Sequence, residues 1–125
     1  MQGKINRPAI LQLALVDSDG YSLIEGADLD GFAVEVWIDD GSGSRVLADP
    51  EDDDLPAWQR IEATVAELGN GQYSVTITPL VPREHYVVVK HDDTSNGWSE
   101  TVSVGVSDTT DLALILGAGV TGLPA

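Results

Sequence analysis

The sequence predicts an all-β domain, a Greek-key β-sandwich of about seven to eight short strands. Apolar residues recur with a period of two rather than the helical period of about 3.6. Clusters of Gly, Pro, Asn and Asp separate the apolar runs about every eight to twelve residues. No internal repeat is present, which favours a sandwich over a barrel. The 125 residues suffice for one domain with a core that needs no metal or disulfide, and the chain has no cysteine.

The first half of the chain contains three expected strands. Residues 10–16 place Leu11, Leu13 and Leu15 on one face and end at the turn cluster 17–20. Residues 45–47 form a short strand after an Asp- and Gly-rich turn. Residues 32–38 are the clearest strand, because Glu35 is expected to point outward between four apolar residues that face inward: Phe32, Val34, Val36 and Ile38.

The second half contains one ambiguous segment, residues 58–68. Its apolar residues fit both helical and strand spacing. Gly69-Asn70-Gly71 follows, and Tyr73, Val75 and Ile77 then alternate. A hairpin therefore describes the segment better than a helix ended by glycine. Residues 86–90 and 102–106 are the last two expected strands.

The two ends of the chain differ from its centre. We expect residues 1–9 to be an N-terminal arm, residues 10–116 to be the sandwich, and residues 117–125 to be an extended, Gly-rich apolar C-terminal arm. Residues 112–125 carry no charge, although acidic residues occur throughout the preceding sequence. Chain ends are usually polar, so this apolar end is expected to be covered by protein. Leu116, Val120 and Leu123 are its candidate partner-binding residues.

The charge of the chain restricts its partners. Six Lys and Arg against 21 Asp and Glu give a net charge of −15 at pH 7. The few cations do not cluster, which argues against nucleic acid and anionic membranes as partners. No apolar stretch approaches the roughly 18 residues of a membrane span. Gln12 interrupts the run 10–16 and no small-residue cleavage site follows it, so we expect no signal peptide.

Acidic and histidine side chains are the candidates for chemistry. Residues 49–54 contain five carboxylates, which could hold a hard cation, although a solvated loop is the expected interpretation. His85 and His91 would lie about 20 Å apart along one strand, too far to share a metal. The sequence has no phosphate-binding loop, nucleophile elbow or zinc motif. It therefore predicts a non-enzymatic protein without a cofactor.

Tryptophans are the remaining candidates for binding. Trp37 is expected on the side of its strand opposite the four inward residues, and Trp58 and Trp98 lie at loop edges. Exposed aromatic residues are typical anchors for protein or sugar partners, while packing at the edge of the core is the alternative for each. We select Trp37 and Trp98 as candidate partner-binding residues.

The hairpin sequence resembles a known group of proteins. Residues 67–78 read E-x-G-N-G-x-Y-x-V-x-x-T, which is similar to a hairpin of small immunoglobulin-like proteins encoded among tailed-phage structural genes. The turn at residues 16–20 and the step at residues 26–29 are also similar to segments of those chains. The resemblance is specific over residues 61–79 and loose elsewhere. It implies an immunoglobulin-like sandwich and supplies no catalytic residues.

This resemblance implies a structural or accessory component of a phage virion: a capsid decoration protein, a neck or head–tail piece, or a tail accessory. Its expected partners are other virion proteins and copies of itself. It would be made in the host cytoplasm and reside in the virion. The alternative is a carbohydrate- or surface-binding adhesion module that uses the tryptophans, with calcium at the acidic loop as an aid.

Overall fold

The computed structural model describes residues 1–17, 19–92, 94 and 97–105, which are nearly all β. Two single-turn 3₁₀ helices, Leu29–Gly31 and Ala57–Gln59, interrupt the strands. The all-β prediction is therefore confirmed. The strands are β1 (Gln2–Lys4), β2 (Ala9–Ala14), β3 (Phe32–Asp39), β4 (Arg45–Leu47), β5 (Thr64–Gly69), β6 (Gln72–Ile77), β7 (His85–His91) and β8 (Gly97–Gly105).

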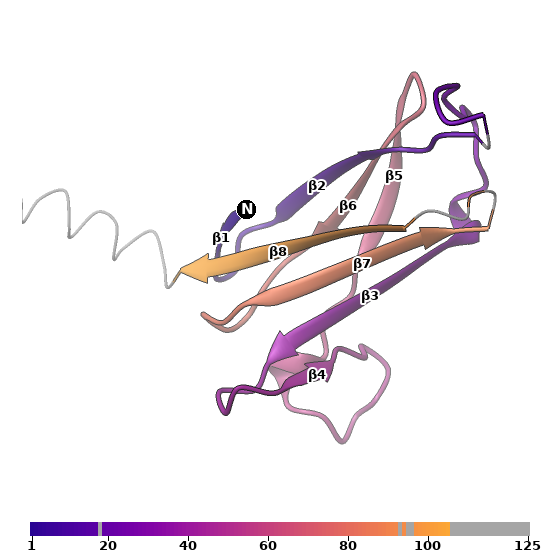
Figure 1. Cartoon of the computed structure of the whole chain (residues 1–125). Coiled ribbons are helices and arrows are strands. Elements are labelled where there is room, and N and C mark those ends of the chain that lie inside the picture. Colours follow the sequence, from indigo (N-terminus) through magenta and orange to yellow (C-terminus); the bar gives the residue numbers. More distant parts are fainter. Residues whose placement is uncertain (18, 93, 95–96, 106–125) are drawn as a thin grey trace, which may run out of the picture.

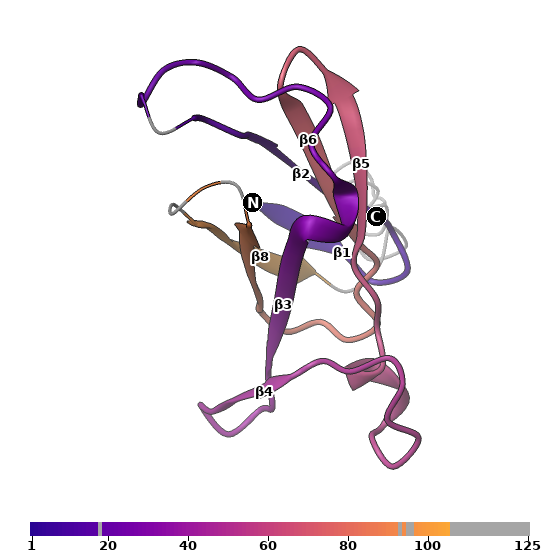
Figure 2. The same ribbon diagram turned by 90° about the vertical axis from the view of Figure 1, so that its right-hand side faces the viewer.

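The strands form two sheets that face each other as a sandwich (Figures 1 and 2). The five-stranded sheet has the order β1-β8-β7-β3-β4, and the three-stranded sheet has the order β2-β6-β5. β1 pairs in parallel with β8, whereas the other paired strands are antiparallel. The chain crosses from one sheet to the other after β1, β2, β4 and β6, so the two layers are interleaved in sequence.

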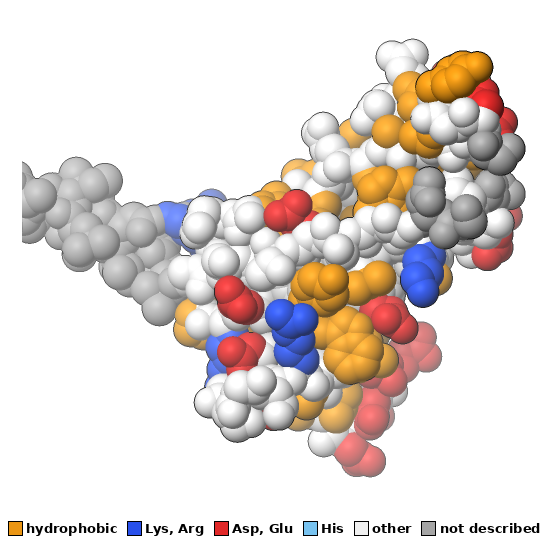
Figure 3. Space-filling view, viewed as in Figure 1, with side chains coloured by type: hydrophobic (Ala, Val, Ile, Leu, Met, Phe, Trp, Pro, Cys, Tyr) orange, Lys and Arg blue, Asp and Glu red, His pale blue; other side chains and the backbone are white. Residues whose placement is uncertain are grey.

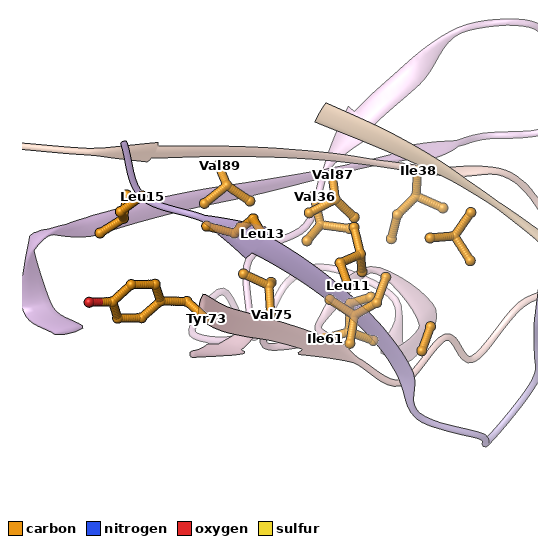
Figure 4. Close-up of a cluster of buried hydrophobic side chains, with 13 residues drawn as sticks. Leu11, Leu13, Leu15, Val36, Ile38, Ile61, Tyr73, Val75, Val87 and Val89 are labelled. Carbon is orange, nitrogen blue, oxygen red and sulfur yellow. The ribbon is translucent and has the colours of Figure 1, made fainter. Parts of the chain in front are cut away.

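The core lies between the sheets and follows the predicted alternation (Figure 4). Leu11, Leu13 and Leu15 are buried on one side of the chain, as expected. Burial of a side chain of this size contributes roughly 1.5–3 kcal/mol. Phe32 and Val34 are partly buried and pack against the core at one end of β3. The two sheets also contribute buried residues from β3, β6, β7 and β8: Val36, Ile38, Tyr73, Val75, Ile77, Val87, Val89 and Val102.

Tyr73 anchors the long connection between β2 and β3 to this core. Its side chain is fully buried, and its ring centroid lies 5.3 Å from that of Phe32. Its hydroxyl donates to the carbonyl of Ile24 (2.8 Å) and accepts from the backbone N–H of Ala27 (3.0 Å). Because both hydrogen-bonding roles are satisfied, the phenol can be buried without the cost of an unpaired polar group.

The ambiguous segment 58–68 is a strand only in its second part and contains no α-helix. β5 begins at Thr64 and pairs with β6 in the expected hairpin, whereas Trp58 lies in the short 3₁₀ helix. Gly69, Asn70 and Gly71 all have positive φ, between 55° and 96°. This backbone conformation suits glycine and asparagine, which explains the composition of the turn.

The described residues also bear on the expected domain boundaries. Residues 1–9, expected to be an arm, contain β1, which is the outermost strand of the five-stranded sheet beside β8, and the buried first residue of β2, Ala9. The sandwich is described as far as Gly105, and the expected arm at residues 117–125 lies outside the described residues. Among those that are described, no helix is long and apolar enough to cross a membrane.

Candidate functional site

The outward side of the five-stranded sheet carries an apolar surface, here called the docking face: Trp37, Leu47, Tyr86 and Val88. Trp37 lies opposite Leu47 of β4 and opposite Tyr86 of β7, so these side chains share one side of the sheet. Leu47 is exposed, and the other three are half-buried. Figure 3 shows hydrophobic side chains gathered over these strands with charged side chains beside them.

Polar groups orient the two aromatic side chains of the docking face. The Arg45 guanidinium lies 4.7 Å from the centroid of the Tyr86 ring, within the range of a cation–π contact. The indole N–H of Trp37 donates to a carboxylate oxygen of Glu35 at 3.3 Å. Each ring therefore has a polar neighbour that restricts its rotation, and both rings are only half-buried. Such an arrangement can bind a partner.

Trp98 lies in a different place from Trp37. It is opposite Val89 in the β7–β8 ladder, so its side chain points to the side of the sheet that faces the core. There it lines a cavity of about 330 Å³ between β2 and β8, here called the β2–β8 groove. The groove is lined by Leu11, Leu13, Val87, Val89 and Trp98, with Met1, Ile10, Gln12, Ser99 and Glu100 completing it.

The remaining predicted binding residues, Leu116, Val120 and Leu123, lie outside the described residues. The structure brings Trp37 together with Leu47, Tyr86 and Val88, three residues that the sequence did not single out. A signal for Tyr86 and Val88 was present, because they alternate with the buried Val87 and Val89. Because residues 86–89 are all apolar, the sequence alone did not show which of them face outward.

Trp58, the third tryptophan, is partly buried and packs against the core. The Arg83 guanidinium lies 4.9 Å from the centroid of its ring. For Trp58, the structure therefore agrees with the alternative interpretation, packing at the edge of the core.

The two histidines are buried at opposite ends of β7 and both face inward. The Nδ1–H of His85 donates to the carbonyl of Arg83 at 2.8 Å, and its Nε2 has no hydrogen-bond partner among the described residues. Burial lowers the pKa of His85 below its ordinary value, against the opposing effect of that hydrogen bond. The Nε2–H of His91 donates to the carbonyl of Asp28 at 2.9 Å, and its ring lies edge-on to Phe32.

Carboxylates in the acidic segments stabilise their own turns. Asp49 accepts from the N–H of Glu51, and Asp52 accepts from the N–H of Asp54, both at 3.0 Å. The hydroxyl of Ser22 and nearby backbone N–H groups donate to Asp19, and these bonds lower the pKa of its carboxyl. Within the described part of the chain, no three His, Cys, Asp or Glu side chains are grouped to hold a metal ion.

Comparisons with known proteins do not assign the chain to a family. No protein-family model matches the chain, and no curated protein is significantly similar to it in sequence. The functional interpretation therefore depends on the docking face, the β2–β8 groove and the charge of the chain.

Proposed function

We propose that this chain is an immunoglobulin-like, non-enzymatic component of a phage virion that works by binding other virion proteins. The strand order supports the immunoglobulin-like class. β8, β7, β3 and β4 correspond to strands G, F, C and C′ of a variable-type domain, and β2, β6 and β5 correspond to strands B, E and D. The hairpin pattern of residues 67–78 supports the phage origin.

The docking face is the observation that carries the proposal. Trp37 and Tyr86 are large, oriented aromatic side chains on an otherwise acidic protein. Aromatic residues of this kind contribute most of the binding energy in protein interfaces. With a net charge of −15, the chain favours a partner whose surface combines an apolar contact with a basic border.

Co-sedimentation with tailed-phage particles assembled without this chain tests the proposal. We expect the wild-type chain to bind and Trp37→Ala to bind at least about tenfold more weakly, the loss typical of an interface anchor. Tyr21→Ala is the matched control, because Tyr21 is 82% exposed in a loop away from the docking face and should not contribute. Equal binding of Trp37→Ala and wild type would exclude the docking face, and no binding by either would contradict the virion role.

The adhesion module remains the second candidate, and the adjacent rings of Trp37 and Tyr86 favour it. Sugars stack on such rings, and Glu35 and Arg45 could accept and donate hydrogen bonds at their border. A glycan-binding measurement with wild type and Trp37→Ala, with and without millimolar calcium, separates the candidates. Saturable sugar binding that Trp37→Ala abolishes would favour adhesion. We expect calcium to change the unfolding temperature only slightly, by screening residues 49–54.

A further inference from the structure

β2 is an edge strand of the three-stranded sheet, and among the described residues no strand pairs with its other side. The backbone N–H of Leu15 donates to the carbonyl of Gly71 (3.2 Å), which extends the β2–β6 ladder by one residue. In an antiparallel pair, hydrogen-bonded positions alternate, so the odd-numbered residues of β2 face β6. The N–H and C=O groups of Ile10, Gln12 and Ala14 therefore point to the free edge.

An apolar space lies beside that free edge. The β2–β8 groove, of about 330 Å³, is lined by inward-facing residues of both sheets, including Leu13, Val89 and Trp98. A strand added along β2 would place alternate side chains into this groove, and its main chain would satisfy the edge groups of β2. The free edge and the groove together form a strand-acceptor site.

The corresponding edge of β8 is only partly covered. The N–H of Ser103 donates to the carbonyl of Met1 (2.8 Å), and the amino group of Met1 donates to the carbonyl of Thr101 (3.1 Å). Met1 and β1 therefore pair with β8 from Thr101 onward, and in the described part of the chain no strand pairs with this edge of β8 at Ser99. The β2–β8 groove lies between β2 and this first half of β8.

The chain itself supplies a sequence that suits this site. Residues 112–116, Leu-Ala-Leu-Ile-Leu, are uncharged and place Leu112, Leu114 and Leu116 on one side of an extended chain. Five residues span about 16 Å, close to the length of β2. Residues 106–111, beyond the end of β8, connect them to the sandwich.

We infer that the strand-acceptor site of one copy binds residues 112–116 of a second copy as an added strand antiparallel to β2. Direction favours the second copy over the same chain. β8 ends beside β1 and runs opposite to β2 (Figure 1), so a segment returning from Gly105 would run parallel to β2, the less stable pairing. This inference deepens the proposed function, since it specifies how copies of the chain join, and its test needs no phage particle.

Charge sets the conditions under which this association occurs. Each copy carries a net charge of −15, so the bodies of two copies repel each other, while the groove and the bound segment are apolar. Salt screens that repulsion and leaves apolar contacts in place, because the Debye length falls from roughly 30 Å at 0.01 M to roughly 8 Å at 0.15 M. Association should therefore strengthen as salt is added.

Disulfide trapping tests the contact directly, because the chain has no cysteine of its own. Gln12→Cys carrying a size tag is mixed with untagged Ala113→Cys and oxidised, and Ile115→Cys is tried in parallel to cover a shifted register. We expect a mixed, tagged–untagged dimer on a non-reducing gel. Ala66→Cys on β5, the other edge of the same sheet, is the matched control and should give much less mixed dimer.

A second variant tests the hydrogen bonding of the edge. Gln12→Pro removes an N–H that points away from β6, so the β2–β6 ladder keeps its bonds while strand addition is blocked. By sedimentation equilibrium we expect wild type to associate, more strongly with salt, and Gln12→Pro to remain monomeric with an unchanged circular dichroism spectrum. Wild type that stays monomeric, or equal trapping by Ala66→Cys, would overturn the inference. So would a double variant, Gln12→Cys with Ala113→Cys, that closes only within one chain.

Discussion

Both sides of β3 and β7 carry large apolar residues, but these residues have different environments. The inward side carries Val36, Ile38 and Val87, which are almost completely buried against the three-stranded sheet. The outward side carries Trp37 and Tyr86, which are larger and yet only half-buried. One large apolar side chain therefore does not show that its side of a strand faces the core. The sheet that packs against it does, and the apolar residues left on the other side become candidates for binding.

The largest expected effect comes from the inward side. Ile38 is fully buried, so Ile38→Ala removes apolar contacts and leaves a cavity that the neighbouring side chains cannot fill. We expect the free energy of unfolding to fall by about 2–5 kcal/mol. Urea unfolding followed by tryptophan fluorescence measures this change. A loss below about 1 kcal/mol would contradict the assignment of this side as the core.

His85, also on the inward side, makes stability depend on pH. Its pKa in the folded protein is lowered by burial, whereas the unfolded chain binds a proton near its ordinary value of about 6.5. Stability should therefore be complete above that pH and decrease as pH falls below it. His85→Gln should reduce this dependence in urea unfolding between pH 7 and pH 5. An identical dependence in the variant would show that other groups cause it.

A smaller effect is expected on the outward side. Trp37→Ala removes cross-strand contacts with Leu47 and Tyr86 but no core packing. We expect the free energy of unfolding to fall by about 1 kcal/mol in the isolated chain. Differential scanning calorimetry compares it with Ile38→Ala. If Trp37→Ala and Ile38→Ala lower the free energy of unfolding by the same amount, the docking face is part of a covered core. The two sides of the sheet would then not differ as described.

The smallest effect is expected for Arg45→Ala. Its guanidinium contacts the Tyr86 ring at the solvent-exposed border of the docking face, and such contacts contribute roughly 0.5–1 kcal/mol at most. The melting temperature should shift little, while the near-ultraviolet circular dichroism of Tyr86 should change because its ring gains freedom. An unchanged aromatic spectrum would mean that Arg45 does not orient the ring.

The sequence predicted the features that depend on local pattern. The inward residues of β2 and β3 and the Gly69-Asn70-Gly71 turn follow from alternation and from the backbone conformations that glycine and asparagine tolerate. The parallel pairing of β1 with β8 could not be predicted in this way, because its partners are about a hundred residues apart in the chain. The side of the sheet occupied by Trp98 was not predicted for a different reason: the expected strand began at residue 102, whereas β8 begins at Gly97 and includes Trp98.

The parallel pairing of β1 with β8 has a mechanical consequence. Met1 lies at the start of one strand, and Gly105 lies at the end of its neighbour. Tension applied between these two points pulls the strands past each other lengthwise, so the hydrogen bonds between them bear the load together. An antiparallel pair pulled from one end would instead open one bond at a time. The sandwich should therefore resist stretching along this axis more strongly than it resists peeling of either strand from its end.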